Sequence, residues 1–245
     1  MSWYQPSVST TWQWQLSGAI NTSYEVDLYD IDLFDTPQST IDDLHARGIK
    51  VICYFSAGSY EEWREDALDF PQEALGNDLS GWPGERWLDI RNEEIHAIMR
   101  ERLDLAKTKG CDGVEPDNVD GYTNNPGFDF DANDQLAYNI FLAESAHERD
   151  LSIALKNDLG QIGTLIEYFD FAVNEQCHEY DECELLEPFI QAGKAVFNAE
   201  YNERYENEET LKLLCEDARL RSFQTLYLPS NLNDKFRVSC AVRNE

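Results

Sequence analysis

The sequence predicts an α/β protein, a single (β/α)₈ TIM barrel over residues 1–245, and three observations support this fold class. Strand-like runs alternate with helix-like segments of about 10 to 15 residues, as in βαβ units of a parallel sheet. The length of 245 residues, 42% of them hydrophobic, suffices for one barrel and its core. No glycine-rich phosphate loop follows an early strand, which argues against a dinucleotide-binding fold. An open doubly wound sheet is the alternative.

Nine segments are candidate strands. Residues 12–16 alternate aromatic and polar side chains, and residues 50–55 form a continuous apolar run of the kind that a parallel sheet buries on both faces. The nine candidates are residues 12–16, 26–34, 50–55, 87–90, the first half of 111–122, 151–155, 171–173, 195–197 and 224–228. A barrel needs eight, so we expect one extra strand, either 12–16 or 87–90, outside the barrel.

Helix-like segments separate these strands. Pro37 is typical of a helix start and Gly48 of a helix end, and residues 92–109 space their apolar side chains for one buried face. The expected helices are residues 37–47, 92–109, 135–149, a short one ending within 165–170, 185–192 and 208–220. Residues 127–134 are expected to form an acidic loop. Residues 60–85 are expected to be irregular, either a lid carrying Trp63 and Trp82 or a packed insertion.

The stretch 111–122 concentrates acidic side chains in a way that suggests function. Gly113 and Pro116 exclude a helix, so we expect a buried strand that opens into a loop carrying Glu115, Asp117 and Asp120. Buried acids are costly unless they are paired, hydrogen-bonded or used in chemistry. An acidic turn that caps the next segment is the plainer interpretation.

Charge limits the partners. The sequence has 19 basic and 48 acidic residues, a net charge of −29, which argues against nucleic acid or an anionic membrane and favours a cationic or neutral partner. Acidity that serves solubility alone is the alternative. The sequence contains no run of 18 apolar residues, so it predicts no membrane-spanning helix. We expect a monomer without a cofactor or bound metal.

The six cysteines suggest an oxidising environment. Cys177 with Cys183, and Cys215 with Cys240, are close enough in sequence to form disulfides, whereas Cys53 and Cys111 could equally be reduced core residues. None fits a zinc-binding spacing. The first residues show no secretory leader, so the protein is either cytosolic or secreted with its leader removed, and we expect the second. The four histidines are expected to be surface or packing residues; they are His45, His96, His147 and His178.

Polar residues recur at the carboxyl ends of the predicted strands, which converge on one face of a barrel. The residues concerned are Asp30, Asp32, Tyr54, Ser56, Asp89, Glu115, Asp117, Lys156, Asn157, Glu175, Glu200 and Tyr201. Each one alone is more often a cap or turn residue, but their agreement across strands predicts an acidic cleft. Paired carboxylates without a Ser-His-Asp order fit glycoside hydrolysis, in which one carboxyl group protonates the leaving oxygen and another attacks or activates water.

Six ordered motifs between Trp12 and Leu228 resemble glycoside hydrolase family 114, the endo-α-1,4-polygalactosaminidases. They read Trp-Gln-Trp-Gln-Leu, Tyr-Asp-Ile-Asp-Leu-Phe-Asp, Val-Ile-Cys-Tyr-Phe-Ser-Ala-Gly-Ser, Gly-Val-Glu-Pro-Asp-Asn-Val-Asp, Ala-Leu-Lys-Asn and Asn-Glu-Gln-Cys. The resemblance implies a (β/α)₈ barrel, secretion and cleavage within α-1,4-linked galactosamine polymers such as galactosaminogalactan or Pel-type exopolysaccharides. By motif, the family's catalytic Asp matches Asp117 and its catalytic Glu matches Glu175.

On this basis we expect Asp117 to be the nucleophile and Glu175 the general acid/base of a retaining reaction, with carboxyl groups about 5 to 5.5 Å apart. Glu115, the other candidate for the first role, is expected to face the barrel interior or to pair with Lys156. The expected substrate-binding residues are Trp14, Asp30, Asp32, Tyr54, Ser56, Asp89, Glu115, Asn118, Lys156, Asn157, Glu200 and Tyr201. A carbohydrate-binding barrel without catalysis and a metal-dependent enzyme are the alternatives.

Overall fold

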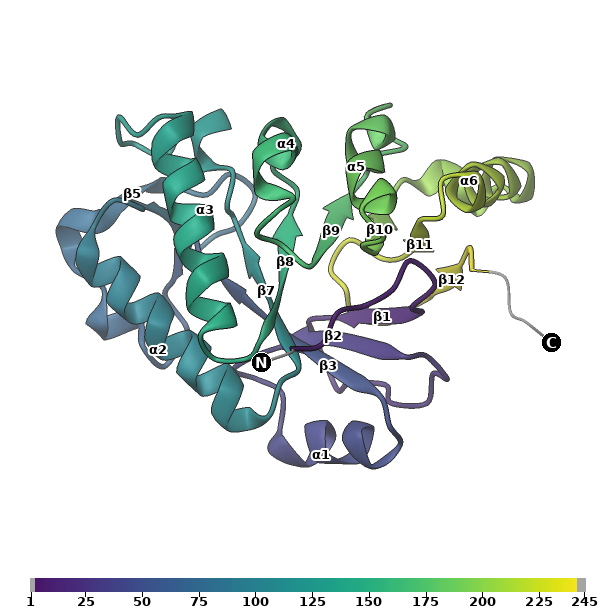
Figure 1. Cartoon of the computed structure of the whole chain (residues 1–245), viewed down its shortest axis with the longest axis horizontal. Helices are drawn as coiled ribbons and strands as arrows, with labels where there is room; N and C mark the ends of the chain where they lie inside the picture. Colours follow the sequence, from purple (N-terminus) through teal and green to yellow (C-terminus); the bar gives the residue numbers. More distant parts are fainter. Residues whose placement is uncertain (1–2, 242–245) are drawn as a thin grey trace.

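The computed structural model describes residues 3–241, which form one curved sheet surrounded by helices (Figure 1). The strand order is β1-β2-β3-β7-β8-β9-β10-β11-β12. The first eight run parallel, and β12 pairs antiparallel with β11. The strands are β1 Trp12–Gln15, β2 Leu28–Asp32, β3 Lys50–Ser56, β7 Gly113–Asp117, β8 Ser152–Lys156, β9 Phe171–Glu175, β10 Val196–Glu200, β11 Gln224–Tyr227 and β12 Val238–Ser239. The predicted barrel fold is confirmed.

Side chains connect the first barrel strand to the last. Trp12 Nε1 donates to the carbonyl oxygen of Gln224 at 2.7 Å, and Gln224 Nε2 donates to the carbonyl oxygen of Val8 at 2.8 Å. The indole of Trp12 also stacks on Phe197, with ring centroids 4.9 Å apart. The edges of β1 and β11 are thus joined through a tryptophan and a glutamine.

The barrel interior and the layer between strands and helices have separate cores. Trp14, Phe171 and Phe197 belong to the interior cluster, whereas Val51, Ile153 and other neighbouring strand residues pack in the outer cluster. This follows from the period of two, which turns alternate residues of a strand to opposite faces. The side chain at the last position of a strand therefore points inward or outward according to its register.

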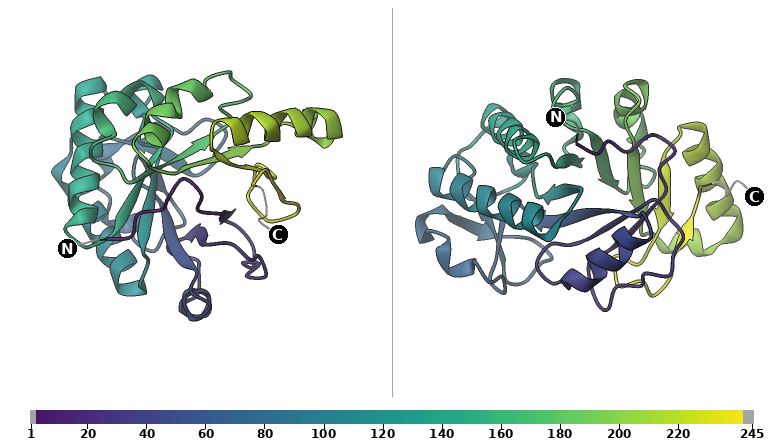
Figure 2. Two further views of the ribbon diagram at one scale, coloured as in Figure 1. Left: turned by 45° about the vertical axis from the view of Figure 1, so that its right-hand side comes forward. Right: turned by 60° about the horizontal axis from the view of Figure 1, so that its bottom comes forward.

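Helices lie outside the sheet, as both views of Figure 2 also show. They are α1 Gln38–Ala46, α2 Glu93–Lys109, α3 Ala132–His147, α4 Ile162–Leu165, α5 Glu187–Gln191 and α6 Glu208–Leu220. Two boundaries differ from expectation. Helix α3 begins three residues early, inside the predicted acidic loop, because Asp131 and Asp134 form a capping box. Helix α4 ends at Leu165, at the start of the interval 165–170 within which the predicted short helix was expected to end.

The segment expected to be irregular contains a small second sheet of order β4-β6-β5. Its antiparallel strands are β4 Ser59–Glu61, β5 Leu75–Asp78 and β6 Glu85–Leu88. In Figure 1 β5 lies beside the helices, apart from the barrel strands. Of the two candidates for the extra strand, residues 12–16 lie in the barrel and residues 87–90 belong in part to this insertion.

All six cysteines form disulfides. The two pairs predicted from sequence are present, Cys177–Cys183 and Cys215–Cys240. A third bridge joins Cys53 of β3 to Cys111, which precedes the neighbouring strand β7. None of the helices between residues 3 and 241 has the length and apolar character needed to cross a bilayer.

Candidate active site

The carboxyl ends of three adjacent barrel strands carry the central polar residues. Asp117 is the last residue of β7, Lys156 of β8 and Glu175 of β9. Alternate residues of each strand face the barrel interior, and these three residues fall on the interior-facing positions of their strands. Their side chains therefore point toward the barrel axis. They meet at the mouth of the barrel, where enzymes of this architecture hold their sites.

Lys156 binds three carboxylates at once. Its Nζ lies 3.2 Å from Glu115 Oε1, 3.1 Å from Asp117 Oδ1 and 3.4 Å from Glu175 Oε2. Burial alone lowers the pKa of Lys156, but Asp117, Glu175 and Glu115 outweigh this effect and hold it well above its ordinary value. The side chain is therefore a buried ammonium ion that offsets the repulsion among the acids.

The shared ammonium limits the distance between the two candidate catalytic groups. The oxygens of Asp117 and Glu175 that contact Lys156 lie 3.1 Å and 3.4 Å from its Nζ, so their separation cannot exceed those two lengths placed end to end. Carboxyl groups of retaining glycosidases stand about 5 to 5.5 Å apart, and those of inverting enzymes about 6.5 to 9.5 Å. Both carboxyl groups therefore reach the same ammonium group, which places them close together at the barrel mouth.

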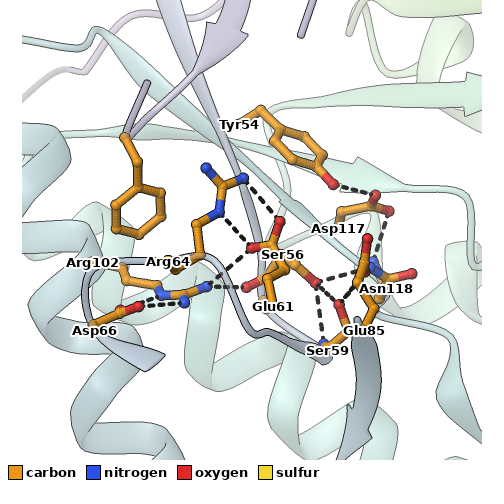
Figure 3. Close-up of polar contacts among 12 residues, drawn as sticks. Tyr54, Ser56, Ser59, Glu61, Arg64, Asp66, Glu85, Arg102, Asp117 and Asn118 are labelled. Atoms are coloured by element: carbon orange, nitrogen blue, oxygen red, sulfur yellow. Dashed lines mark hydrogen bonds and ion pairs between the residues drawn. The ribbon is translucent and has the colours of Figure 1, made fainter. Parts of the chain in front are cut away.

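Each of these two carboxylates accepts a further hydrogen bond from a tyrosine. Tyr54 donates to Asp117 Oδ2 at 2.8 Å, as Figure 3 shows, and Tyr201 donates to Glu175 Oε1 at 2.6 Å. Asp117 also accepts the backbone N–H of Asn118 at 2.7 Å. Burial first, and then the neighbouring carboxylate, raises the pKa of both phenols well above the usual value. Both tyrosines therefore stay protonated and serve as donors.

The backbone turns sharply directly after each of these strands. Asn118, Asn157, Asp158 and Gln176 have φ angles of 60°, 51°, 44° and 62°. Residues other than glycine rarely adopt this left-handed region, which Asn and Asp tolerate best. Such positions concentrate at functional sites. Here they turn the chain away immediately after Asp117, Lys156 and Glu175.

A second layer of acids lies below the first in the barrel interior. Glu115 and Asp30 are fully buried, and Glu115 Oε2 accepts a hydrogen bond from Trp14 Nε1 at 3.1 Å. Burial raises the pKa of Glu115 to about 7, with Lys156 acting against it. Burial and the adjacent Glu115 raise the pKa of Asp30 well above the usual value. Asp30 therefore supports the site from beneath, next to Glu115.

The side chains of Asp117, Lys156 and Glu175 line a cleft of about 430 Å³. Its walls include Trp82 and Glu85 from the inserted sheet and Asp120 and Gln176 from the loops after β7 and β9. The family model of glycoside-hydrolase family GH114 matches residues 1–244.

The chain belongs to glycoside hydrolase family GH114. The crystal structure of Aspergillus fumigatus Ega3 in complex with galactosamine is similar, with 44% identity, 98% coverage of each chain and a TM-score of 0.93. The glycoside hydrolase domain of PelA from Pseudomonas aeruginosa has 12% identity over 94% of this chain and 98% of that chain. Its TM-score of 0.74 shows a shared fold. The comparison with curated proteins gives no match.

Most residues expected at the site of this GH114 chain line the cleft. Those that do are Trp14, Tyr54, Asn118, Lys156, Asn157 and Tyr201, together with Asp117 and Glu175. The expected pairing of Glu115 with Lys156 is present. Asp30 lies deeper than expected, with 0% of its surface exposed, so it cannot contact a sugar directly.

Asp32 does not face the cleft, which corrects its expected role. Both of its oxygens accept hydrogen bonds from Arg64, at 3.0 Å and 2.7 Å, and Asp32 is 4% exposed. Figure 3 shows Arg64 and Arg102 in a buried network with Glu61 and Asp66. Asp32 belongs to this ion-pair network. No local pattern indicated that Arg64 would fold back over the strand end.

Three other expected binding residues also have structural contacts. Ser56 is fully buried and accepts a hydrogen bond from Asn118 Nδ2 at 2.8 Å, so it positions Asn118 (Figure 3). Asp89 follows a strand outside the barrel and pairs with Arg91 at 2.9 Å. Glu200 ends β10 on its outer face, where its Oε1 accepts from the His178 backbone N–H at 2.9 Å. The register of β10 explains this, since Phe197 and Ala199 occupy the inner face.

Sequence reasoning missed Glu85, Gln176 and the cleft position of Asp120. Burial raises the pKa of Glu85 to about 7, and Ser59 donates to its Oε2 at 2.8 Å. Glu85 is the first residue of β6, just before the predicted strand 87–90, and nothing in the sequence indicated that this strand contributes to the cleft. Asp120, in contrast, lies in the motif after β7 and could have been included on that signal.

Metal-binding side chains come close together at one place among residues 3–241, at Cys177, His178 and Cys183. A disulfide joins these two cysteines, which removes both thiolates as ligands. His178, expected to be a packing residue, instead lies between Glu200 at 3.2 Å and Asp217 at 3.2 Å.

Proposed function

We propose that this GH114 enzyme hydrolyses internal α-1,4 linkages in galactosamine-containing polysaccharide with retention of configuration. The observation that carries the proposal is the pair Asp117 and Glu175, held at close spacing by Lys156. The similar Ega3 was crystallised with galactosamine, which supports the substrate class. A net charge of −29 suits a polymer whose free amino groups are cationic.

The hydrogen bonds support a division of roles within the pair. Asp117 accepts from Lys156, Tyr54 and the backbone N–H of Asn118, which together stabilise an ionised nucleophile. Glu175 lies farther from Lys156, and its side chain is 29% exposed against 20% for Asp117. The more exposed carboxyl group is suited to exchange protons as the general acid and base.

The reaction then follows two steps. An Asp117 oxygen attacks the anomeric carbon while the glycosidic bond breaks, and Glu175 gives its proton to the departing oxygen. In the second step Glu175 takes a proton from water, whose oxygen attacks the same carbon and releases Asp117. Lys156 and the tyrosines keep both groups in place throughout. Trp14, Asn118 and Asn157 are proposed substrate contacts.

The cleft adjoins two further cavities, so a chain longer than one sugar can lie along it, which supports internal cleavage. One cavity shares Leu79 and Trp82 with the cleft, and the other shares Asn157 and Gln176 with it. Trp82 is 56% exposed and offers a flat surface on which a sugar ring can stack. Trp63 does not line the cleft, so the inserted sheet contributes one of the two tryptophans expected of a lid.

We also propose that the protein is secreted and monomeric. Three disulfides persist in an oxidising environment such as the extracellular space. Light scattering of the purified protein at several concentrations should give a constant mass near that of one chain. A mass that doubles with concentration would contradict the monomer.

The function is tested by incubating the protein with partly deacetylated poly-α-1,4-galactosamine and following product size. We expect a rapid fall in polymer length with oligomers of mixed size, and NMR of the first products should show the α-anomer. Tight binding without cleavage would instead favour a binding barrel. Loss of activity in a chelator, restored by a divalent cation, would favour a metal-dependent enzyme.

A further inference from the structure

A chain of hydrogen bonds joins the inserted sheet to the residue that follows Asp117 (Figure 3). It starts at Glu85, the first residue of β6, and passes through Ser59, the first residue of β4. It continues to Ser56, the last residue of β3, and ends at Asn118. Both serines are fully buried, and Glu85 is 7% exposed. The chain therefore lies largely out of water, where hydrogen bonds are strong and polarise one another.

An ionised Glu85 sets the direction of this chain. A carboxylate only accepts, so Ser59 gives its one hydroxyl hydrogen to Glu85 Oε2 at 2.8 Å. Ser59 Oγ is left to accept, and its contact of 2.6 Å with Ser56 Oγ must therefore use the Ser56 hydrogen. Because both hydroxyl hydrogens are used, Asn118 has to turn its NH₂ group toward the serines, with Nδ2 2.8 Å from Ser56 Oγ and 3.2 Å from Ser59 Oγ. The amide oxygen of Asn118 is thereby left for the cleft that this residue lines.

Asn118 contacts the proposed nucleophile and has an unusual backbone conformation. Its N–H donates to Asp117 Oδ1 at 2.7 Å, and its φ angle is 60°. Gly58 packs so tightly here that a Cβ at that position would lie 1.6 Å from the Asn118 carbonyl oxygen. A residue in a sparsely populated conformation persists only where its surroundings hold it. The hydrogen bonds from its side chain to Ser56 and Ser59 are part of that support.

Glu85 changes its charge close to neutral pH. Burial raises the pKa of this carboxyl group to about 7, against the hydrogen bond from Ser59, which lowers it. Of the charged groups that act on Glu85, Glu61 of β4 and Asp117 of β7 raise its pKa further, and Arg64, which follows β4, lowers it. Above about pH 7 the carboxylate dictates the direction of the chain. Below this pH the neutral acid carries a donor of its own and no longer does so.

We propose that Glu85 is a positioning residue for hydrolysis, and that its carboxylate fixes Asn118 against Asp117 by holding the hydrogen-bond chain in one direction. The inserted sheet then belongs to the catalytic machinery, although Glu85 acts through other residues and not on the reacting atoms. The proposal rests on the proposed function, because it needs Asp117 as the nucleophile. It also gives a reason for a buried acid and two buried hydroxyl groups beside the cleft, which cost free energy unless they are paired.

Ser59→Ala tests the chain, because it interrupts the link while Glu85 stays in the cleft lining. At matched folded fraction, we expect kcat/KM on deacetylated polymer to fall by about tenfold to a hundredfold. In the wild type, protonation of Glu85 should lower kcat as the pH falls through about 7, and this step should be missing in the variant. Wild-type activity in Ser59→Ala would show that Glu85 does not act through the chain and would overturn the proposal, as would a slow variant that keeps the step.

Ser152→Ala is the matched control. Ser152 is also a fully buried serine in a strand, at the start of β8, and its Oγ has no hydrogen-bond partner among residues 3–241. Its substitution removes the same hydroxyl group from the protein interior and should leave kcat/KM and the pH profile unchanged. If Ser152→Ala also removes the step near pH 7, the effect comes from the loss of any buried hydroxyl group, and the chain is not the cause.

Two substitutions of Glu85 separate its role as an acceptor from its charge. Glu85→Gln keeps an oxygen that can accept from Ser59 but does not titrate, so it should retain most of the activity without the step near pH 7. Glu85→Leu removes the acceptor and should lose as much activity as Ser59→Ala. Equal losses in Glu85→Gln and Glu85→Leu would show that the charge acts directly in the cleft and would overturn the proposal.

The double variant Glu85→Leu/Ser59→Ala tests whether the two residues act as one unit. It should lose no more activity than either single variant, because each substitution already breaks the chain. Losses that multiply would show that the two residues act independently and would overturn the proposal. Glu73→Gln, on an exposed glutamate of the same insertion, is the control for charge and should keep the step near pH 7.

NMR of the wild type tests the chain without any hydrolysis. The side-chain NH₂ signals of Asn118, identified by their loss in Asn118→Asp, should shift with a midpoint near pH 7 as Glu85 changes its charge. The shift should disappear in Glu85→Gln and in Ser59→Ala. Signals that stay constant in the wild type, or that titrate equally in Glu85→Gln, would overturn the proposal. A protein that fails to cleave the polymer while its Asn118 signals follow Glu85 would refute the proposed function and leave the coupling of Glu85 to Asn118 supported.

Discussion

Lys156 is the residue on which the charge balance of the site depends. It is the one basic side chain in the described cleft lining, and it contacts three acids that would otherwise repel one another in a buried setting. Repulsion of this kind raises the pKa of carboxyl groups. The ammonium group therefore offsets this repulsion, and at Glu115 it acts against the rise in pKa that burial causes.

Lys156→Gln should lower kcat/KM and move the acidic limb of its pH profile to higher pH by about one to three pH units, because the buried acids would lose the cation that offsets their mutual repulsion. The pH profile of hydrolysis measures this, with Lys212→Gln, an exposed lysine paired with Glu216, as the control that should not change it. An unshifted limb in Lys156→Gln would mean that Lys156 does not offset this repulsion.

Asp32 shows how a strand-end acid can serve stability rather than binding. Asp32→Ala removes two charged hydrogen bonds from the buried Arg64 and should lower the free energy of unfolding by about 3 kcal/mol. Asp35 contacts the same guanidinium at 3.5 Å but is 78% exposed, so Asp35→Ala should cost less than about 1 kcal/mol. Urea unfolding of the two variants measures both losses of stability. Equal losses would contradict the structural role of Asp32, as would an altered preference for deacetylated chains in Asp32→Ala.

At the scale of elements, the strands and helices that depend on a local sequence pattern could be predicted. The eight barrel strands, the helix α6 and the polar ends of β7, β8 and β9 follow from apolar runs and the turn residues after them. The inserted sheet was predicted only in part, through the candidate strand 87–90 that overlaps β6, because β4 and β5 are short and β5 pairs with β6 irregularly. Glu200 was misplaced because a one-residue change of register moves a side chain to the opposite face.

The disulfides link elements over different lengths of chain and should stabilise to different degrees. Cys53–Cys111 closes a separation of 58 residues and Cys177–Cys183 one of 6. In the chain-entropy account the longer loop contributes about 4 kcal/mol and the shorter about 2 kcal/mol. Paired substitution to serine should therefore lower stability more at Cys53 and Cys111. The reverse order in chemical unfolding of the two variants would contradict this account.

At the scale of the whole molecule, buried acids gather around one face of an acidic protein. Burial raises the pKa of Glu85, Glu115 and Asp158 to about 7 and of Asp120 to about 6. The unfolded chain releases these protons near pH 4, so between about pH 4 and pH 7 the folded state binds more protons than the unfolded state. Stability is therefore expected to fall as pH rises through this interval.

The melting temperature should thus be higher near pH 5 than near pH 8, by several degrees. Glu115→Gln should flatten this slope, because it removes a group whose pKa is raised by burial. Glu179→Gln serves as the control, since hydrogen bonds from Gln176 and Asn202 lower the pKa of Glu179, a shift opposite to that of Glu115. Scanning calorimetry between pH 5 and pH 8 measures these melting temperatures. A melting temperature that rises with pH would refute the prediction.

The most direct test of the account is the hydrolysis rate of Asp117→Asn and Glu175→Gln on deacetylated poly-α-1,4-galactosamine, each compared with the wild type at matched folded fraction. Both substitutions keep the size of the side chain and its contacts with Tyr54 or Tyr201. We predict that the wild type cleaves internally and that each variant loses several orders of magnitude in rate while it still binds the polymer. Retention of near wild-type activity by either variant would show that the carboxylates held by Lys156 are not the catalytic pair.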